Sequence, residues 1–196
     1  MVISYILPSK QQTNFMINFQ DIQIKDLTFT PYIMRNEIMG RIQELAIRIN
    51  DDYVDKKPLF LSVLNGSFMF TSDLMKMIDV ESEIKFIHVS SYDGLKSTGK
   101  IKDNFELGKW VTDRHIIIVE DIVDTGNTMN YLLKKIQQWD PSSVEVATLF
   151  LKNECLDYDL DLKYIGFSIQ DRFIVGYGLD YDGLGRNYQD VYQIVD

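Results

Sequence analysis

The chain has 196 residues, of which 45% are hydrophobic and 25% are charged, and this is enough to bury the core of one globular domain. Its formal charge of −9 would repel nucleic acid and anionic membrane surfaces, so neither is an expected partner. One cysteine excludes an internal disulfide, no apolar run reaches the roughly 20 residues of a membrane span, and the N-terminus lacks the basic stretch of a secretory signal, so we expect a soluble cytoplasmic protein.

The beginning of the chain predicts an arm followed by a helix. Residues 1–28 carry little periodic signal and are expected to form an arm along a sheet edge. Thr30 is suited to a helix N-cap and Pro31 to the first helical position. From Met34 to Ile49 apolar residues recur at helical spacing, which predicts an amphipathic helix with one buried face.

Strands and helices then alternate along the chain. Residues 58–64 predict a buried strand that stops at an Asn-Gly turn, and the helical spacing over residues 70–78 predicts a helix after this turn. Residues 83–92 predict another strand. The polar stretch over residues 93–110 contains three glycines, and we expect it to form a flexible excursion or a hairpin.

The second half of the chain continues this alternation and then changes character. Residues 115–121, with the apolar run 116–119 at their centre, predict a strand buried on both faces. Residues 129–139 predict a helix, and residues 142–152 predict a strand. Strands that alternate with helices indicate an α/β fold, a mostly parallel twisted sheet flanked by helices, with ligands at the carboxyl ends of the strands. The last fifty residues show only short strands and glycine-containing turns, which predicts a small β-rich hood. We therefore expect a single domain with its core at about 30–152. The hood would consist of residues 153–196, approximately, together with the N-terminal arm.

The segment VEDIVDTGNTM, residues 119–129, places three acids, a glycine and two threonines at the end of a buried strand. Backbone N–H groups and hydroxyls at the start of the following helix would form a cradle for phosphate. Glu120 and Asp121 are suited to sugar hydroxyls and to a hard cation, which prefers oxygen ligands. An acid at such a position more often only caps a helix, but capping does not require the whole pattern. The Walker and Rossmann phosphate motifs are both missing from the sequence, which disfavours a plain ATPase or dehydrogenase.

This segment closely resembles the phosphoribosyl-pyrophosphate motif of the type I phosphoribosyltransferases, and further matches run from PLFLSVLNGSFMF to an Arg-Asn pair near the C-terminus. The segments LFLK and YIGFSIQDRFIVGYGLDYDGLGR resemble the lysine and the purine-binding hood of the hypoxanthine-guanine group of this family. The resemblance implies a Mg²⁺-dependent enzyme of purine salvage. It would move a 5-phosphoribosyl group from phosphoribosyl pyrophosphate to N9 of a 6-oxopurine. The expected 6-oxopurines are hypoxanthine and also guanine.

The resemblance also implies a role for each matched residue. The ribose 5-phosphate would lie on Asp124, Thr125, Gly126, Asn127 and Thr128, the ribose hydroxyls near Glu120 and Asp121, and the purine N7 near Asp124 as the catalytic acid or base. Pyrophosphate would be bound by Asn65, Gly66 and Arg186, with a cis peptide bond before Asn65; the base would be bound by Lys152, Phe173 and Ile174; and Mg²⁺ would be bound by Asp180, Glu120 and Asp121. Ser91 and Tyr92 would begin a lid over residues 91–109.

Three positions depart from the family pattern. Asn65 and Asn127 stand where many or some members of the family carry lysine, so each phosphate loop lacks a cation. Glu154 stands close after Lys152, where other members carry proline or basic residues. The sequence leaves open the choice among hypoxanthine, guanine and xanthine, and a homodimer or homotetramer is what the resemblance implies. The alternatives are a phosphoribosyltransferase for another base, xanthine or a pyrimidine, and a regulator that uses the same fold as a ligand sensor.

Overall fold

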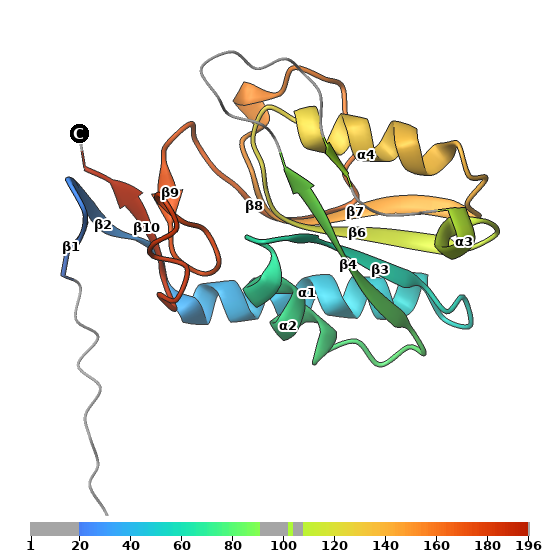
Figure 1. The fold of residues 1–196 in the computed structure, drawn as a ribbon. Helices are drawn as coiled ribbons and strands as arrows, with labels where there is room; N and C mark the ends of the chain where they lie inside the picture. Colours follow the sequence, from blue (N-terminus) through green and yellow to red (C-terminus); the bar gives the residue numbers. More distant parts are fainter. Residues whose placement is uncertain (1–19, 91–101, 104–107, 196) are drawn as a thin grey trace, which may run out of the picture.

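The computed structural model describes residues 20–90, 102–103 and 108–195, which form two β-sheets with helices packed on the larger one (Figure 1). The larger sheet has six strands in the order β5-β4-β3-β6-β7-β8. Their bounds are β3 (Leu59–Leu64), β4 (Glu83–Ser90), β5 (Lys102–Asp103), β6 (His115–Val123), β7 (Ser143–Leu151) and β8 (Tyr164–Ser168). All neighbours run parallel except β5, which pairs antiparallel with β4. The predicted α/β fold with a mostly parallel sheet is confirmed.

Helices cover both faces of the larger sheet (Figure 1). α1 (Arg35–Asp52) and α2 (Phe68–Met75) lie on one face and α4 (Asn127–Gln137) on the other, while α3 (Gly108–Val111) and the 3-10 turn η1 (Asn153–Cys155) are short. Phe60 and Ile117 belong to the core cluster that contains the apolar residues of α1 and α2, whereas Leu61 and Ile118 belong to the cluster of α4. Successive residues of β3, and likewise of β6, point into opposite core layers. Both faces of these two strands are therefore buried, and this explains why their residues are apolar without alternation.

The smaller sheet joins the two ends of the described chain. It is antiparallel and has the order β1-β2-β10-β9, with β1 (Ile22–Ile24), β2 (Leu27–Ile33), β9 (Ile174–Val175) and β10 (Val191–Ile194). We call residues 20–33 and 173–195 the hood. The hood has a core cluster of its own, formed by Ile24, Phe29, Val175 and Tyr192. Figure 1 shows it at one end of the larger sheet.

The predicted start of the first helix is wrong. Thr30 and Pro31 lie within β2, and α1 begins at Arg35 after Met34, whose backbone N–H donates to the Glu37 carboxylate at 3.0 Å. The strand continues through Pro31 because the pairing with β10 shifts register next to it, and proline is tolerated in a sheet at such an irregularity. The predicted apolar face of the helix is correct, since Ile38, Ile42, Leu45 and Ile49 are all buried.

The segment that begins at Tyr164 was expected in the hood, and this placement is also wrong. It forms β8, which pairs parallel with β7 at the edge of the larger sheet. The connection between these strands, residues 152–163, contains only the turn η1 and no α-helix, so the chain lacks the helical spacing that normally marks a parallel crossover. Gly166 fits against β7 because a Cβ there would lie 2.5 Å from the Leu149 carbonyl oxygen.

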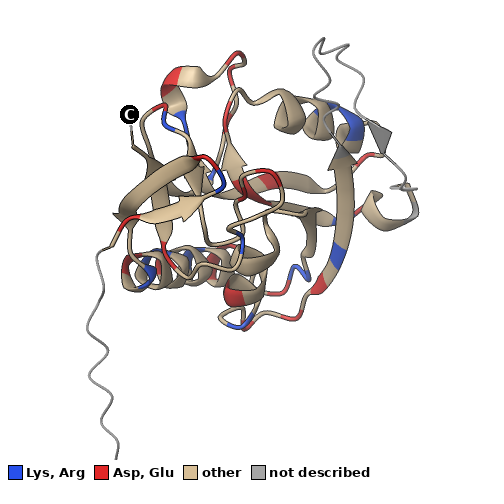
Figure 2. Ribbon diagram, turned by 60° about the vertical axis from the view of Figure 1, so that its left-hand side comes forward, with Lys and Arg blue, Asp and Glu red and all other residues tan. Residues whose placement is uncertain are grey.

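Charged side chains are distributed over the whole fold. Figure 2 shows the lysines and arginines of the described residues spread along the ribbon instead of gathered in one stripe. No helix in this part of the chain combines the length and the apolar character needed to cross a membrane.

Candidate active site

Three neighbouring strands bring the predicted residues to one edge of the larger sheet. β3 ends just before Asn65, β6 ends just before Asp124, and β7 ends just before Lys152. These strands lie side by side and parallel in the sheet, so their carboxyl ends point the same way. The site is therefore built from loops that follow adjacent strands, where ligands of open α/β sheets bind.

The loop after β3 rests on a buried network of hydroxyl groups. The Ser62 Oγ lies 2.8 Å from both the Ser67 Oγ and the Thr71 Oγ1, and Ser67 donates to the Val63 carbonyl at 2.5 Å. All three hydroxyl-bearing residues are buried, so each hydroxyl is satisfied by another part of the same loop and helix. The peptide bond between Leu64 and Asn65 is cis, as the resemblance implied.

Gly66 joins this loop to the acids of the motif. A Cβ at Gly66 would lie 1.7 Å from the Asp121 Oδ2, so no other residue fits while this carboxylate keeps its position. Glycine allows the backbone to approach the carboxylate directly. The predicted pyrophosphate loop and the predicted ribose-binding acids therefore lie in contact.

Glu120 and Asp121 form a buried acidic pair. Burial raises the pKa of the Glu120 carboxyl well above its usual range, and the charge of Asp121 raises it further. Burial also raises the pKa of Asp121, although hydrogen bonds from Glu120 and from backbone N–H groups, together with the Arg186 charge, act in the opposite direction. Glu120 Oε2 is the one buried side-chain oxygen or nitrogen without a hydrogen-bond partner in the described residues. Such an atom is suited to a ligand hydroxyl or a cation.

The loop after β6 encloses a cavity of about 100 Å³ lined by Glu120 and residues 122–129. Gly126 has φ 81° at the N-cap of α4, a conformation that glycine adopts without strain. The first backbone N–H groups of α4 have no acceptor within the helix and lie at its positive end. This is the arrangement expected of the predicted phosphate cradle.

Asn127, one of the positions that depart from the pattern implied by the resemblance, belongs to a chain of hydrogen bonds over this loop. The Tyr158 hydroxyl donates to the Asn127 Oδ1 at 2.9 Å, and the Asn127 amide donates to the Thr125 Oγ1 at 2.8 Å. The Asp157 backbone N–H donates to the Thr125 carbonyl at 3.0 Å, which fixes the segment 156–160 against the loop. Because Thr125 Oγ1 accepts from Asn127, its own hydroxyl proton remains free to donate to a phosphate oxygen.

Lys152 is buried and shared by two carboxylates. Its Nζ donates to the Asp124 Oδ2 at 2.9 Å and to the Asp171 Oδ1 at 3.0 Å. Burial alone would lower the pKa of the ammonium, but the two carboxylates outweigh it and raise the pKa. The possible metal-ligating atoms of three residues, Asp124, Cys155 and Asp171, lie within 4.8 Å of one another. The two carboxylates of this group are already paired with the Lys152 ammonium, which takes the place that a metal cation would have.

The predicted base-binding residues of the hood follow Asp171, a partner of this lysine, in the chain. Phe173 is 43% exposed and lines a cavity of about 460 Å³ together with Asp171 and Glu154. Its ring is held by the edge-on Tyr181 ring at 5.9 Å between centroids. Ile174 opens β9 with a buried side chain, so its backbone is the part available to a ligand.

Arg186 and Asp180 hold the hood turn against the loop after β3. The two side chains form an ion pair at 2.5 Å, and Arg186 also donates to the Gly178 carbonyl at 2.7 Å. A Cβ at Gly178 would lie 2.1 Å from the Gly66 carbonyl oxygen, so the two backbones touch. Asp180 further accepts from the Gly183 backbone N–H and is not gathered with Glu120 and Asp121 into one ligand cluster of the described residues.

Comparison with known proteins identifies the family of this chain. The family model for the phosphoribosyl transferase domain matches residues 34–182. The chain belongs to the phosphoribosyltransferase family. It is 40% identical to the hypoxanthine-guanine-xanthine phosphoribosyltransferase of Tritrichomonas foetus over 154 residues, which are 78% of this chain and 84% of that protein. It is also 40% identical to the hypoxanthine-guanine phosphoribosyltransferase of Streptococcus mutans over 156 residues, 79% of this chain and 85% of that protein.

A solved phosphoribosyltransferase has the same fold. The crystal structure of a hypoxanthine-guanine phosphoribosyltransferase from Bacillus anthracis matches with a TM-score of 0.79 and 34% identity, covering 88% of this chain and all of that chain. The resemblance noted in the sequence is thereby confirmed. Ser91 and Tyr92, predicted to begin a phosphoribosyltransferase lid, lie outside the described residues. Asp171 was not predicted, since an exposed acid in a short loop carries no distinguishing pattern in the sequence.

Proposed function

We propose that the protein transfers a 5-phosphoribosyl group from 5-phospho-α-D-ribose 1-diphosphate to N9 of hypoxanthine, and of guanine, and releases pyrophosphate. The observation that carries this proposal is the Lys152 ammonium, which lies 2.9 Å from the Asp124 carboxylate at the edge of the phosphate cradle. In this proposal Lys152 would recognise the 6-oxo oxygen, and the adjacent Asp124 would exchange a proton with the purine. The names of the relatives support the same reaction class.

Each loop then has one part of the substrate to bind. The cradle of residues 124–128 would bind the 5-phosphate through backbone N–H groups and the Thr125 and Thr128 hydroxyls. Asn65, Gly66 and Arg186 would bind the pyrophosphate, and Phe173 and Ile174 would bind the base. The contact between Gly66 and Asp121 supports this arrangement, because it would bring the leaving group next to the acids proposed to bind ribose, as a displacement at C1 requires.

The reaction builds positive charge on the ribose ring as the bond to pyrophosphate breaks. Glu120 and Asp121 are fixed beside the expected ribose position and are shielded from water. A cation bound beside them would favour their charged forms. Carboxylates held in this way would stabilise the transition state more than the ground state. Asp124 has an accessible side chain, 50% exposed, and would hold or deliver the proton at N7 of the purine.

The residues present are suited to Mg²⁺. Glu120 Oε2 is buried without a partner, and a hard cation prefers carboxylate oxygen ligands. Glu120 and Asp121 would hold the ion, which would neutralise negative charge on the pyrophosphate donor. Asp180, the third predicted ligand, is paired with Arg186 and is not gathered with these two acids in the described residues. Cytoplasmic location and assembly into a homodimer or homotetramer belong to the same proposal.

A spectrophotometric assay with the donor, Mg²⁺ and each purine in turn tests the proposal. Lys152 offers three donors and no acceptor, so hypoxanthine satisfies it while the 6-amino group of adenine does not. We expect adenine to be at least ~10³-fold poorer in kcat/KM, and Lys152→Gln to lower hypoxanthine use and narrow that difference. Comparable use of adenine by the unaltered protein, or an unchanged ratio in the variant, would contradict the proposal. Xanthine is included because the name of the Tritrichomonas relative contains it.

A further inference from the structure

Lys152 is held by two carboxylates that come from different parts of the fold. Asp124 follows β6, whereas Asp171 lies in the loop between β8 and β9. Both contacts are of hydrogen-bond length, 2.9 and 3.0 Å, while the lysine side chain is 8% exposed and the Asp171 side chain is 69% exposed. The lysine is thus a buried cation with one partner inside the catalytic loop and one partner outside it.

The proposed reaction gives Asp124 a second task. When its carboxylate turns to the purine N7 or takes up a proton, it no longer compensates the Lys152 charge in full. A buried ammonium that loses its partner is destabilised, and it responds by releasing its proton or by moving toward water. Either response would remove the donor that recognises the 6-oxo oxygen.

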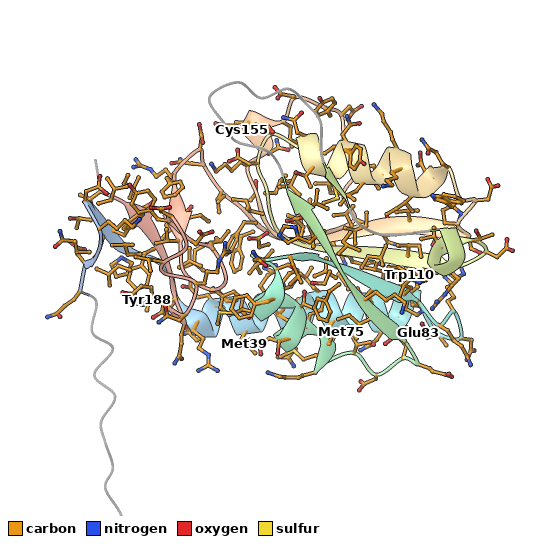
Figure 3. The ribbon with its side chains drawn as sticks, in the orientation of Figure 1. Met39, Met75, Glu83, Trp110, Cys155 and Tyr188 are labelled. Atoms are coloured by element: carbon orange, nitrogen blue, oxygen red, sulfur yellow. The ribbon has the colours of Figure 1, made fainter. Side chains whose placement is uncertain are left out.

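The backbone around Asp171 fixes the second carboxylate near the end of β7. The Ile169 N–H donates to the Leu151 carbonyl at 2.8 Å, so this loop is tied to the residue directly before Lys152. The Arg172 N–H donates to the Gln170 carbonyl at 2.8 Å, which closes a tight turn around Asp171. Figure 3 shows Cys155 on the turn η1, and its thiol lies within 4.8 Å of the Asp171 and Asp124 carboxylate oxygens.

We infer that Asp171 is a positioning residue for base recognition, which keeps Lys152 charged and directed at the 6-oxo oxygen while Asp124 is engaged with the purine. This inference rests on the proposed function and adds a residue to it. Asp171 acts through Lys152 and needs no contact with the substrate. Its effect should therefore appear in the use of the base and not in the use of the phosphoribosyl donor.

The test compares Asp171→Asn and Asp171→Glu with Asp161→Asn as the matched control. Asp161 is an exposed acid in the connection between β7 and β8, and in the described residues it is not an ion-pair partner of Lys152, so its variant removes the same charge without touching the lysine. All variants are checked for unchanged thermal unfolding. KM for hypoxanthine, KM for the donor, kcat, and the ratio of kcat/KM for hypoxanthine to that for adenine are then measured.

For Asp171→Asn we expect KM for hypoxanthine to rise about tenfold, the order expected when one hydrogen bond to a charged group is lost, with KM for the donor unchanged and a smaller hypoxanthine-to-adenine ratio. Asp171→Glu should recover part of the loss, and Asp161→Asn should behave as the unaltered protein. An unchanged KM for hypoxanthine in Asp171→Asn, an equal rise in both KM values, or the same effect in Asp161→Asn would overturn the inference. The proposed function survives those outcomes, whereas failure of the unaltered protein to use hypoxanthine overturns both.

Discussion

The three acids at residues 120–124 differ in exposure, and this difference separates their chemistry. Glu120 and Asp121 are only 9% and 8% exposed, and burial raises the pKa of both carboxyls. Asp124 is half exposed and already bonded to an ammonium. A buried pair is suited to fixed interactions with ribose and a cation, while an accessible carboxylate is suited to proton transfer.

Asp124→Asn tests this division at a single residue. The amide keeps the size of the side chain but cannot accept a proton, so we expect the fold and donor binding to persist while kcat falls by roughly 10²-fold or more. Steady-state kinetics with hypoxanthine, together with a binding measurement for the donor, provide the result. An unchanged kcat would remove the acid or base role from Asp124.

Much of the candidate site follows from the sequence because its residues are local. Residues 120–128 form one strand end and one turn, and the pattern of acids, glycine and threonines describes both. The contact of Lys152 with Asp171 could not be predicted in this way, because the two residues are 19 positions apart in the sequence. Acids also occur in ordinary turns of this chain, so nothing in the sequence distinguishes Asp171. The packing of Gly66 against Asp121 depends on two strands lying side by side, which local patterns do not specify.

At the scale of elements, the order of strands and helices was predictable where apolar periodicity is strong. The continuous apolar run of β6 and the helical spacing of α1 and α4 each indicate the element that is observed. Boundaries and partners were less predictable. Pro31 resembles a helix start but lies at an irregularity of the hood sheet, and β8 pairs with the larger sheet without a helical crossover.

The end of α1 is tied to the start of β8 by one carboxylate. Asp52 Oδ2 accepts from the Tyr164 hydroxyl at 2.6 Å and lies 2.9 Å from the Lys163 Nζ. These contacts lower the pKa of Asp52 below its model-peptide value of 3.8, with the Tyr164 hydrogen bond as the largest cause. A depressed folded-state pKa means that the stabilisation is present above pH 3.8 and is lost as the pH falls through the lower folded-state value.

Asp52→Asn should therefore destabilise the protein in a pH-dependent way. At pH 7 we expect a loss of about 1 kcal/mol in the free energy of unfolding, because the charged contacts are partly exposed. Near pH 3 the difference from the unaltered protein should shrink, since Asp52 is then largely protonated in the unfolded chain, and this protonation stabilises the unfolded state. Asp51→Asn, an exposed acid on the same helix turn, is the control for the change in net charge. Urea unfolding at both pH values measures the effect, and a constant difference would contradict it.

At the scale of the whole molecule, the site depends on how the hood meets the larger sheet. The hood has a small apolar core and supplies Phe173, Ile174, Asp180 and Arg186, while the larger sheet supplies the phosphate loops. The Gly178 backbone touches the Gly66 carbonyl, and Arg186 holds the same turn by donating to the Gly178 carbonyl. This contact fixes the distance between the residues expected to bind the base and those expected to bind pyrophosphate.

The contribution of this contact to stability can be measured by comparing Gly178→Ala with Gly183→Ala. Both glycines have positive φ, 100° and 82°, so alanine at either position carries a conformational cost of about 1 kcal/mol. A Cβ at Gly178 would lie 2.1 Å from the Gly66 carbonyl oxygen, whereas a Cβ at Gly183 would meet no atom within 4 Å. Because backbone atoms must move to relieve the overlap, we expect Gly178→Ala to lose about 2 kcal/mol more in urea unfolding than Gly183→Ala. Its KM for the donor should also rise, since the displaced Gly66 loop is the one expected to bind pyrophosphate. Equal losses of stability in the two variants, with equal KM values for the donor, would show that the hood can shift relative to the sheet without disturbing the site.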